Sequence, residues 1–244
     1  MKLIVANWKM NPGTEEEEIA LARAIQNKNL VIAPPFVFLE ALRGVVREGA
    51  LGAQDIAVED KGAFTGEVSG SQLAALGVSY VIIGHSERRI KLRETDEIVG
   101  QKLVAAFRNN LTPILCVGET AADHAAGRSQ EVVIQQLERS LVGITTELKT
   151  SLVIAYEPVW AISTEPGALS DTPEAAAAMI GSMQAYIRSR VLGAHIRFVY
   201  GGSVTEQNAD GFLKQKIIEG ALVGGASLRE QEIKNIIHIS QQYD

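Results

Sequence analysis

The sequence predicts an α/β protein, a (β/α)₈ barrel, on three observations. The chain has 244 residues, a length typical of this fold. Short apolar runs that do not alternate with polar residues recur along its whole length, as expected of strands buried on both faces of a parallel sheet. Segments with helical periodicity separate these runs. A doubly wound open sheet has the same alternation, so it stays open as an alternative at this point.

Eight apolar runs are predicted as strands. They are Leu3–Ala6, Leu30–Ala33, Leu51–Ala53, Tyr80–Ile83, Pro113–Val117, Leu152–Tyr156, Arg197–Tyr200 and Gly220–Val223. No linker or shift of composition divides them, so we expect a single domain over residues 1–244.

Three helix starts are marked by a threonine in the capping position. Thr14 precedes four glutamates, Thr95 precedes an acidic pair, and Thr172 precedes Pro173. Threonine as the cap, acids in the first turn and proline at the first helical position are each typical of a helix N-terminus.

Composition bounds the class of function. Apolar residues make up 46% and charged residues 21%, an ordinary balance for a soluble globular protein. The net charge of −6 without a basic block argues against a nucleic-acid or membrane-surface partner, and no apolar run reaches the roughly 18 residues of a membrane span. Cys116 is the only cysteine and no signal-peptide core is visible, so we expect a cytoplasmic protein.

Polar residues follow the predicted strands at their carboxyl ends. Asn7 and Lys9 follow the first strand, His85 the fourth and Glu157 the sixth. Each alone has an ordinary explanation, such as a solvated lysine, a turn histidine or a loop glutamate. In a barrel, however, all strand ends meet on one face, and that face carries the chemistry. The barrel therefore predicts one pocket that contains Lys9, His85 and Glu157.

Glu157 is expected to be held at a strand tip. Pro158 removes a backbone donor and restricts the residue before it to extended geometry, so the strand ends there. Tyr156 and Trp160 flank the carboxylate, and we expect them to displace water from it. A desolvated carboxylate is a better base.

Two pairs of glycines follow the last two strands. They are Gly201-Gly202 and Gly224-Gly225, and each precedes a segment with a helical pattern. Glycine lets the backbone approach a ligand, and amides at a helix start favour phosphate. Either pair alone could be a tight turn. Because barrels often bind phosphate after strands seven and eight, together they predict a phosphate site.

The predicted pocket thus combines a carboxylate, an imidazole, a cation and a phosphate site. The histidines have no metal-ligand spacing, and no Gly-x-Gly-x-x-Gly follows a strand, so we expect neither a metal nor a nucleotide cofactor. A carboxylate base with Lys9 and His85 as electrophiles suits proton abstraction next to a carbonyl. Both would stabilise the enediolate oxygen.

Several motifs, in order, resemble the triosephosphate isomerase family over nearly the whole chain. They are Asn7–Asn11, Gly84–Arg89, Cys116–Glu119, Ala155–Trp160, Tyr200–Val204 and Gly224–Leu228. The resemblance implies the TIM barrel fold. It also implies interconversion of dihydroxyacetone phosphate and D-glyceraldehyde 3-phosphate without a cofactor.

The resemblance implies roles for individual residues. Glu157 matches the base that moves the proton, and His85 matches the electrophile that polarises the carbonyl. Lys9 matches the cation, Glu87 its carboxylate partner, and Asn7 lies beside the substrate. The family account adds a histidine kept neutral by a helix N-terminus and a lid that excludes water.

Other residues match the family's substrate and subunit contacts. Residues 62–68 resemble the dimer loop of a homodimer, with Thr65 inserting beside the partner's active site and Glu67 meeting Arg88 of the partner subunit. Cys116 resembles a family cysteine near the catalytic glutamate, or is simply packed in the core. The residues that match the phosphate contacts are Ser163, Ser203, Gly224 and Gly225.

The lid departs from the family pattern, which usually reads Ala-Ile-Gly-Thr-Gly-Lys after the tryptophan. Here Ser163 and Glu165 replace two glycines, Pro166 stands at the lysine, and the segment up to Thr172 is longer. We expect Glu165 to point to solvent, Pro166-Gly167 to form the outer turn, and the amide of Ser163 to contact phosphate.

Two other functions remain to be weighed. Resemblance to a pentose-phosphate epimerase would imply a metal site built from histidine and aspartate, and this chain lacks such a set of residues. A barrel that has lost catalysis and serves as a binding or scaffold protein would be signalled by loss of Lys9, His85 or Glu157. All three are present, and only the altered lid favours that alternative.

Overall fold

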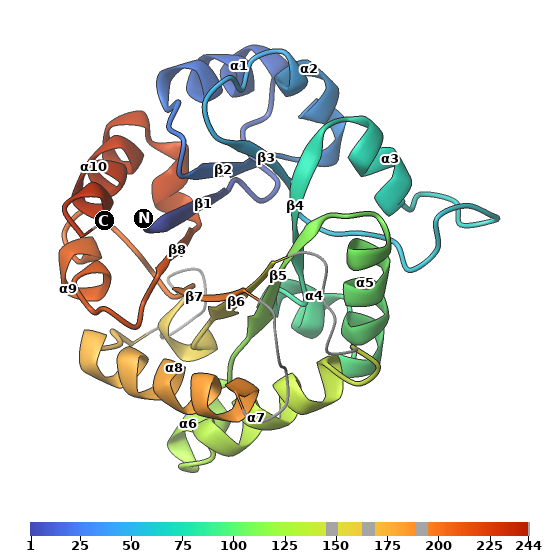
Figure 1. Ribbon diagram of the computed structural model, residues 1–244. Coiled ribbons are helices and arrows are strands. Elements are labelled where there is room, and N and C mark those ends of the chain that lie inside the picture. Colours follow the sequence, from blue (N-terminus) through green and yellow to red (C-terminus); the bar gives the residue numbers. More distant parts are fainter. Residues whose placement is uncertain (145–150, 163–168, 189–194, 244) are drawn as a thin grey trace.

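The described strands close into one parallel barrel. The computed structural model describes residues 1–144, 151–162, 169–188 and 195–243, and in it β1 pairs with both β2 and β8, so the open sheet is wrong (Figure 1). Every predicted strand is confirmed, and four begin earlier than predicted. The strands are β1 (Leu3–Asn7), β2 (Leu30–Ala33), β3 (Ala50–Ala53), β4 (Val78–Ile83), β5 (Thr112–Val117), β6 (Leu152–Tyr156), β7 (Ile196–Tyr200) and β8 (Gly220–Val223).

Helices form a ring around the barrel (Figure 1). The predicted caps are confirmed, since the side chains of Thr14, Thr95 and Thr172 each accept from a backbone N–H three residues later. The α-helices are α1 (Glu15–Ala24), α2 (Leu39–Arg43), α3 (Gly70–Ala75), α4 (Ser86–Lys91), α5 (Asp96–Arg108), α6 (Ala121–Ala125), α7 (Ser129–Ser140), α8 (Pro173–Arg188), α9 (Ala209–Leu213) and α10 (Glu230–Gln241). Short 3₁₀ helices in the described residues are η1 (Phe36–Phe38), η2 (Val159–Ala161) and η3 (Gly225–Leu228).

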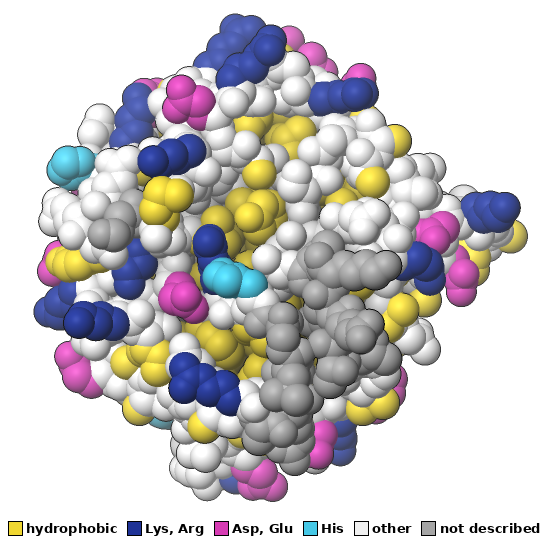
Figure 2. All heavy atoms as spheres, viewed as in Figure 1, with side chains coloured by type: hydrophobic (Ala, Val, Ile, Leu, Met, Phe, Trp, Pro, Cys, Tyr) yellow, Lys and Arg dark blue, Asp and Glu magenta, His cyan; other side chains and the backbone are white. Residues whose placement is uncertain are grey.

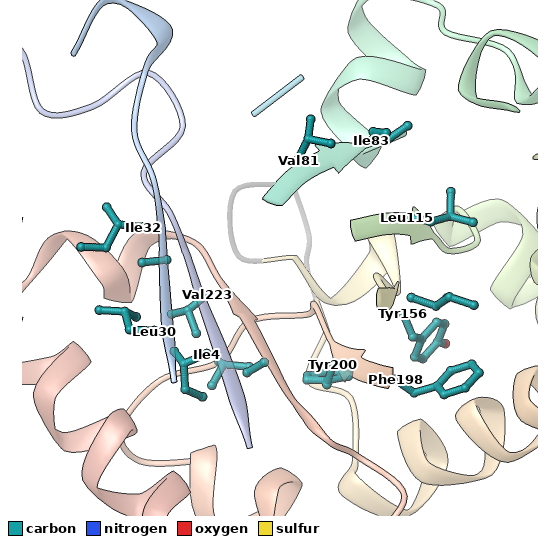
Figure 3. Close-up of a cluster of buried hydrophobic side chains, with 14 of the residues drawn as sticks. Ile4, Leu30, Ile32, Val81, Ile83, Leu115, Tyr156, Phe198, Tyr200 and Val223 are labelled. Carbon is teal, nitrogen blue, oxygen red and sulfur yellow. The ribbon is translucent and has the colours of Figure 1, made fainter. Parts of the chain in front are cut away.

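The core has two layers because successive strand residues point to opposite faces. The larger layer lies between strands and helices, where Figure 3 shows residues spaced two apart, such as Leu30 and Ile32 on β2. The other layer fills the barrel interior and includes Val5 on β1 and Ala155 on β6. Asn7 and Glu157 lie two residues after Val5 and Ala155, so their side chains point to the same, inner face of the barrel. The alternation therefore carries these polar side chains onto the carboxyl-terminal end of the barrel.

Between β3 and α3 the chain projects beyond the ring of helices (Figure 1). Figure 2 shows charged and hydrophobic side chains together on this projection. Phe64, within it, has 51% of its surface exposed. Among the residues that the structure describes, no helix is long and apolar enough to cross a membrane.

Candidate active site

One cavity at the carboxyl ends of the strands collects the predicted catalytic residues. It has a volume of about 150 Å³ and is lined by Asn7, Lys9, His85 and Glu157, together with residues that follow β7 and β8. These four come from three different strand ends, so the barrel brings together groups that are far apart in sequence.

The carboxylate of Glu157 is buried, with 1% of the residue exposed. Its Oε2 accepts from the backbone N–H of Ser86 at 3.1 Å, at the start of α4. Its own backbone N–H donates to the carbonyl of Val117 at 2.8 Å. Glycines allow this close packing, because a Cβ at Gly118 would lie 1.8 Å from the Glu157 carbonyl oxygen and one at Gly201 would lie 2.7 Å from its Cγ.

The two aromatic residues that flank Glu157 have a different role from the one the sequence suggested. Tyr156 and Trp160 both donate to the buried carboxylate of Glu119, at 3.2 Å and 2.7 Å to Oε1. Glu157 is enclosed instead by Ser86, the glycines and Cys116. The Cys116 thiol is buried, and burial together with the Glu157 charge raises its pKa well above the ordinary value.

His85 is held in one orientation at the start of α4. The backbone N–H of Glu87 donates to its Nδ1 at 3.2 Å, so Nδ1 is an acceptor and the ring hydrogen lies on Nε2. Nε2 is 3.2 Å from Oε1 of Glu157, without the alignment of a hydrogen bond. A neutral imidazole therefore presents an N–H beside the carboxylate.

Lys9 adopts a left-handed backbone conformation with φ of 54°, which is uncommon for a residue other than glycine. Asn7 stabilises it by accepting from the Lys9 backbone N–H at 3.1 Å, and the Gln54 amide donates to the Lys9 carbonyl at 2.7 Å. The Lys9 ammonium contacts Oε1 of Glu87 at 2.7 Å.

The charge of Glu87 is stabilised by its neighbour. Burial would raise the pKa of this carboxyl, but the hydrogen bond and charge of Lys9 outweigh it, so the pKa is lowered. Glu87 therefore remains ionised at neutral pH, and the site holds an ion pair next to a neutral histidine.

Backbone from the last two βα loops forms the other wall of the cavity. Gly224 lies against Lys9, where an added Cβ would be 3.4 Å from Cε, and η3 begins at Gly225. Its first amides form the helix start expected to favour phosphate. Ser203 lines the same wall.

The helix predicted after Gly201-Gly202 begins later than the sequence suggested. α9 starts only at Ala209, so the amides near Gly202 belong to a loop. Gly202 is still required, because a Cβ there would lie 2.2 Å from the Tyr200 hydroxyl oxygen. Thr205 and Arg229 also line the cavity. Sequence reasoning missed both, since neither directly follows a strand.

The remaining predicted residues lie apart from this cavity or outside the described residues. Ser163, Glu165 and Pro166-Gly167 fall in the undescribed range 163–168. Thr65 and Glu67 are exposed on the projection between β3 and α3. Arg88 pairs within the chain with Asp55 and Glu94, each at 2.7 Å.

Comparisons with known proteins agree with this geometry. The sequence profile of the family described as triosephosphate isomerase matches residues 2–240. A triosephosphate isomerase of Dictyoglomus thermophilum is 41% identical over 244 residues, covering 97% of this chain and 98% of that protein. One from Moorella thermoacetica is 44% identical over 246 residues, covering 98% of each. One from Roseiflexus castenholzii is 42% identical over 252 residues, covering 97% of this chain and 96% of that protein. The chain belongs to the triosephosphate isomerase family.

Proposed function

We propose that this chain is an isomerase that interconverts dihydroxyacetone phosphate and D-glyceraldehyde 3-phosphate, with Glu157 as the base. The observation that carries the proposal is the buried Glu157 carboxylate beside the neutral imidazole of His85, at 3.2 Å, in a cavity that also contains Lys9. Family membership supports the same reaction. The catalytically impaired alternative has no support from these groups, since all three are in place.

In the proposed reaction Glu157 removes a proton from the carbon next to the carbonyl. The electron pair of that C–H bond moves into the new carbon–carbon double bond, and the carbonyl oxygen gains negative charge. The proton of the substrate hydroxyl moves to this oxygen, which leaves the negative charge on the other oxygen. Glu157 then returns its proton to the neighbouring carbon, so no atom is gained or lost. Because Glu157 is buried, its carboxylate is desolvated, and a desolvated carboxylate is a better base.

His85 and Lys9 stabilise the oxygen charge in this proposal. The Nε2–H of His85 can donate to a substrate oxygen because Nδ1 is already occupied by the Glu87 amide. Lys9 supplies a positive charge whose position is fixed by Glu87. Donors aimed at developing charge in a water-poor site lower the barrier strongly.

The substrate phosphate binds at the wall formed by Ser203, Gly224 and Gly225. The start of η3 supplies backbone amides, and Arg229 adds a cation at the edge of the cavity. We also propose that the amide of Ser163 contacts phosphate, although residue 163 lies outside the described residues.

The test is Glu157→Gln, which keeps shape and removes the proton acceptor. General base catalysis contributes roughly 10²–10⁴-fold, so turnover should fall at least that far. Inorganic phosphate should still bind, as measured by calorimetry. Isomerisation of glyceraldehyde 3-phosphate within a few-fold of the parent would remove Glu157 from this role.

We further propose a cytoplasmic homodimer in which residues 62–68 dock against a second copy. Exposed apolar side chains support an interface, since Met10 is 92% and Phe64 51% exposed. Thr65 would reach the partner's pocket and Glu67 would approach Arg88 of the partner subunit. Arg88 is already shared by Asp55 and Glu94, so Glu67 would add a third carboxylate.

Shortening residues 63–68 tests the dimer. Sedimentation should detect monomers, and activity should fall because the partner no longer orders the loop that carries Lys9. A full-length chain that remains monomeric and fully active at nanomolar concentration would contradict the dimer requirement.

A further inference from the structure

Glu119 is a buried carboxylate with an unusual set of partners. It follows β5 and is completely inaccessible to solvent. Its donors are neutral, namely the Trp160 indole N–H at 2.7 Å and the Tyr156 hydroxyl at 3.2 Å. In the part of the chain that the structure describes, no lysine or arginine forms an ion pair with it. A buried charge without a cation is costly, so any group that can bring positive charge to Glu119 is of interest.

His124 on α6 is such a group. Its ring stacks on the ring of Trp160, with centroids 4.0 Å apart and planes inclined by 22°. Its Nδ1 lies 3.7 Å from Oε1 of Glu119 and 3.2 Å from the hydroxyl of Ser129. The His124 side chain is 43% exposed, so solvent protons reach it. The imidazole thus covers the indole while facing the carboxylate.

These contacts hold the short helix that follows the proposed base. Trp160 lies in η2, which begins two residues after Glu157. The backbone N–H of Val159 donates to the carbonyl of Glu119 at 3.1 Å, in addition to the indole contact. Glu119 and His124 therefore fix η2 from the β5 side, and the position of η2 constrains Glu157.

We propose that His124 is a positioning residue for Glu157 that acts through Trp160 and Glu119, and that it holds η2 more firmly when it gains a proton. The proposal rests on the proposed role of Glu157 as the base. A protonated imidazole would attract the Glu119 carboxylate and would add a cation–π contact to the stacking on Trp160.

Two acidic residues face His124 from other parts of the chain, while η2 presents Trp160 to it and α7 presents Ser129. Glu119 faces it from the loop after β5, and Asp171 from the segment before α8. Burial raises the pKa of Asp171, and the hydrogen bonds from the Thr172 N–H and from Tyr200 oppose this rise. The charge of Glu119 adds to the rise, and a charge on His124 would oppose it.

On α6 itself, Asp123 is occupied by the hydroxyl of Thr120, at 2.7 Å, and by Arg128. Arg128 brings a positive charge close to α6, and its pairing with Asp123 partly neutralises that charge. A charge gained by His124 therefore meets Glu119 and Asp171 with little opposition.

Three substitutions separate stacking from charge. His124→Phe keeps an aromatic ring on Trp160 and removes the titrating nitrogen. His124→Gln removes both. His238→Gln makes the same change on α10, outside the contacts described above, and serves as the matched control. None of these residues lines the cavity.

The first readout is tryptophan emission without substrate, scanned between pH 5 and 8.5. An imidazolium stacked on an indole quenches its fluorescence, and histidine is the side chain that ordinarily changes charge in this range. Emission should fall towards low pH in the parent and in His238→Gln, and this step should be lost in both His124 variants. Persistence of the step in His124→Gln would overturn the proposal. Because no substrate is used, this result stands whether or not the proposed reaction is correct.

The second readout is the ratio of parent to variant kcat/KM as a function of pH. The ratio cancels the titration of groups that both proteins share. At pH 8, His124→Gln should lower kcat by roughly three- to tenfold, the size expected for loss of an aromatic pair, with little change in KM. His124→Phe should retain most of the activity at pH 8 but fall behind the parent at pH 6. A ratio near one at every pH, or equal losses in the two variants at pH 8, would overturn the positioning role.

Discussion

Asp55 and Glu18 are both buried carboxylates, but their partners differ. Asp55, after β3, is 5% exposed; it accepts from Lys102 at 2.7 Å on each oxygen and forms an ion pair with Arg88 at 2.7 Å. Glu18, on α1, is 0% exposed, and neither of its oxygens has a hydrogen-bond partner in the described part of the chain. This barrel therefore contains both a paired and an unpaired buried acid.

The two acids avoid the cost of burial in different ways. Burial raises the pKa of Asp55, while the charge and hydrogen bond of Lys102 and the charge of Arg88 oppose the rise. Its three short contacts with cationic nitrogens are those of an ionised group. Burial raises the pKa of Glu18 to about 8, so Glu18 is mostly protonated at neutral pH. A buried acid without a cation becomes neutral, whereas one with cations remains charged.

The paired acid stands next to the active site. Arg88 contacts Asp55 and Glu94 from α4, and in the first turn of α4 the Ser86 backbone N–H contacts Glu157 and the Glu87 carboxylate contacts Lys9. Ion pairs on the outer side of α4 therefore fix the helix whose start holds Glu157 and Lys9. Glu18 does not line the cavity.

The largest effect is expected from Lys102→Met. The Lys102 ammonium contacts Asp55 at 2.7 Å and Glu94 at 2.5 Å, so its loss leaves two buried carboxylates with only Arg88. Breaking a buried pair on one side costs about 3–5 kcal/mol, and the free energy of unfolding in urea should fall by that amount. Lys102→Arg keeps the charge and is the control. A loss below about 1 kcal/mol for Lys102→Met would mean that Asp55 is not held as an ion pair.

At Glu18, in contrast, removing the buried acid is expected to increase the free energy of unfolding. In the folded chain its pKa is about 8, above its ordinary value of 4.5, so the folded chain holds a proton that the unfolded chain releases. Stability should therefore fall as pH rises from the ordinary value to about 8, with no further fall from this group at higher pH. Glu18→Gln should abolish this dependence. Glu18→Leu should in addition raise the free energy of unfolding at pH 8 by about 1–3 kcal/mol, because it removes an unsatisfied buried group.

Equilibrium unfolding at pH 5 and pH 8 checks the Glu18 prediction. Glu16→Gln and Glu16→Leu, on the exposed side of the same helix, are matched controls that should change neither the pH dependence nor the stability appreciably. If the parent and Glu18→Gln lost the same stability between the two pH values, the carboxyl would not be protonated in the folded chain.

The comparison also marks what the sequence could predict. Strands and the convergence of Lys9, His85 and Glu157 follow from short-range patterns, because strand ends and the barrel closure dictate them. The glutamates after Thr14 were predicted as an acid-rich helix start, without a buried member among them, yet Glu18 is three residues before Leu21 on the same face and is buried with it. The helical spacing alone places Glu18 on the buried face, but a charged side chain is ordinarily expected to be exposed.

Partnerships between distant residues had no comparable signal. Asp55 and Lys102 are 47 positions apart, and no local pattern in the sequence says that their side chains meet. The stacking of His124 on Trp160 was hidden for the same reason. Both contacts depend on how loops and helices pack around the barrel, which sequence periodicity does not record.

The smallest effect is expected where a pair is exposed. Arg108 donates to Asp60 at 2.6 Å, but their side chains are 44% and 34% exposed. The Arg108 and Asn109 hydrogen bonds lower the pKa of Asp60, yet water and salt screen this pair as they cannot screen Lys102 and Asp55. Arg108→Gln should therefore reduce the free energy of unfolding by less than about 1 kcal/mol. The difference should shrink further in 1 M salt, while the loss caused by Lys102→Met persists. A salt-resistant loss of several kcal/mol at Arg108 would show that burial does not set the strength of ion pairs in this protein.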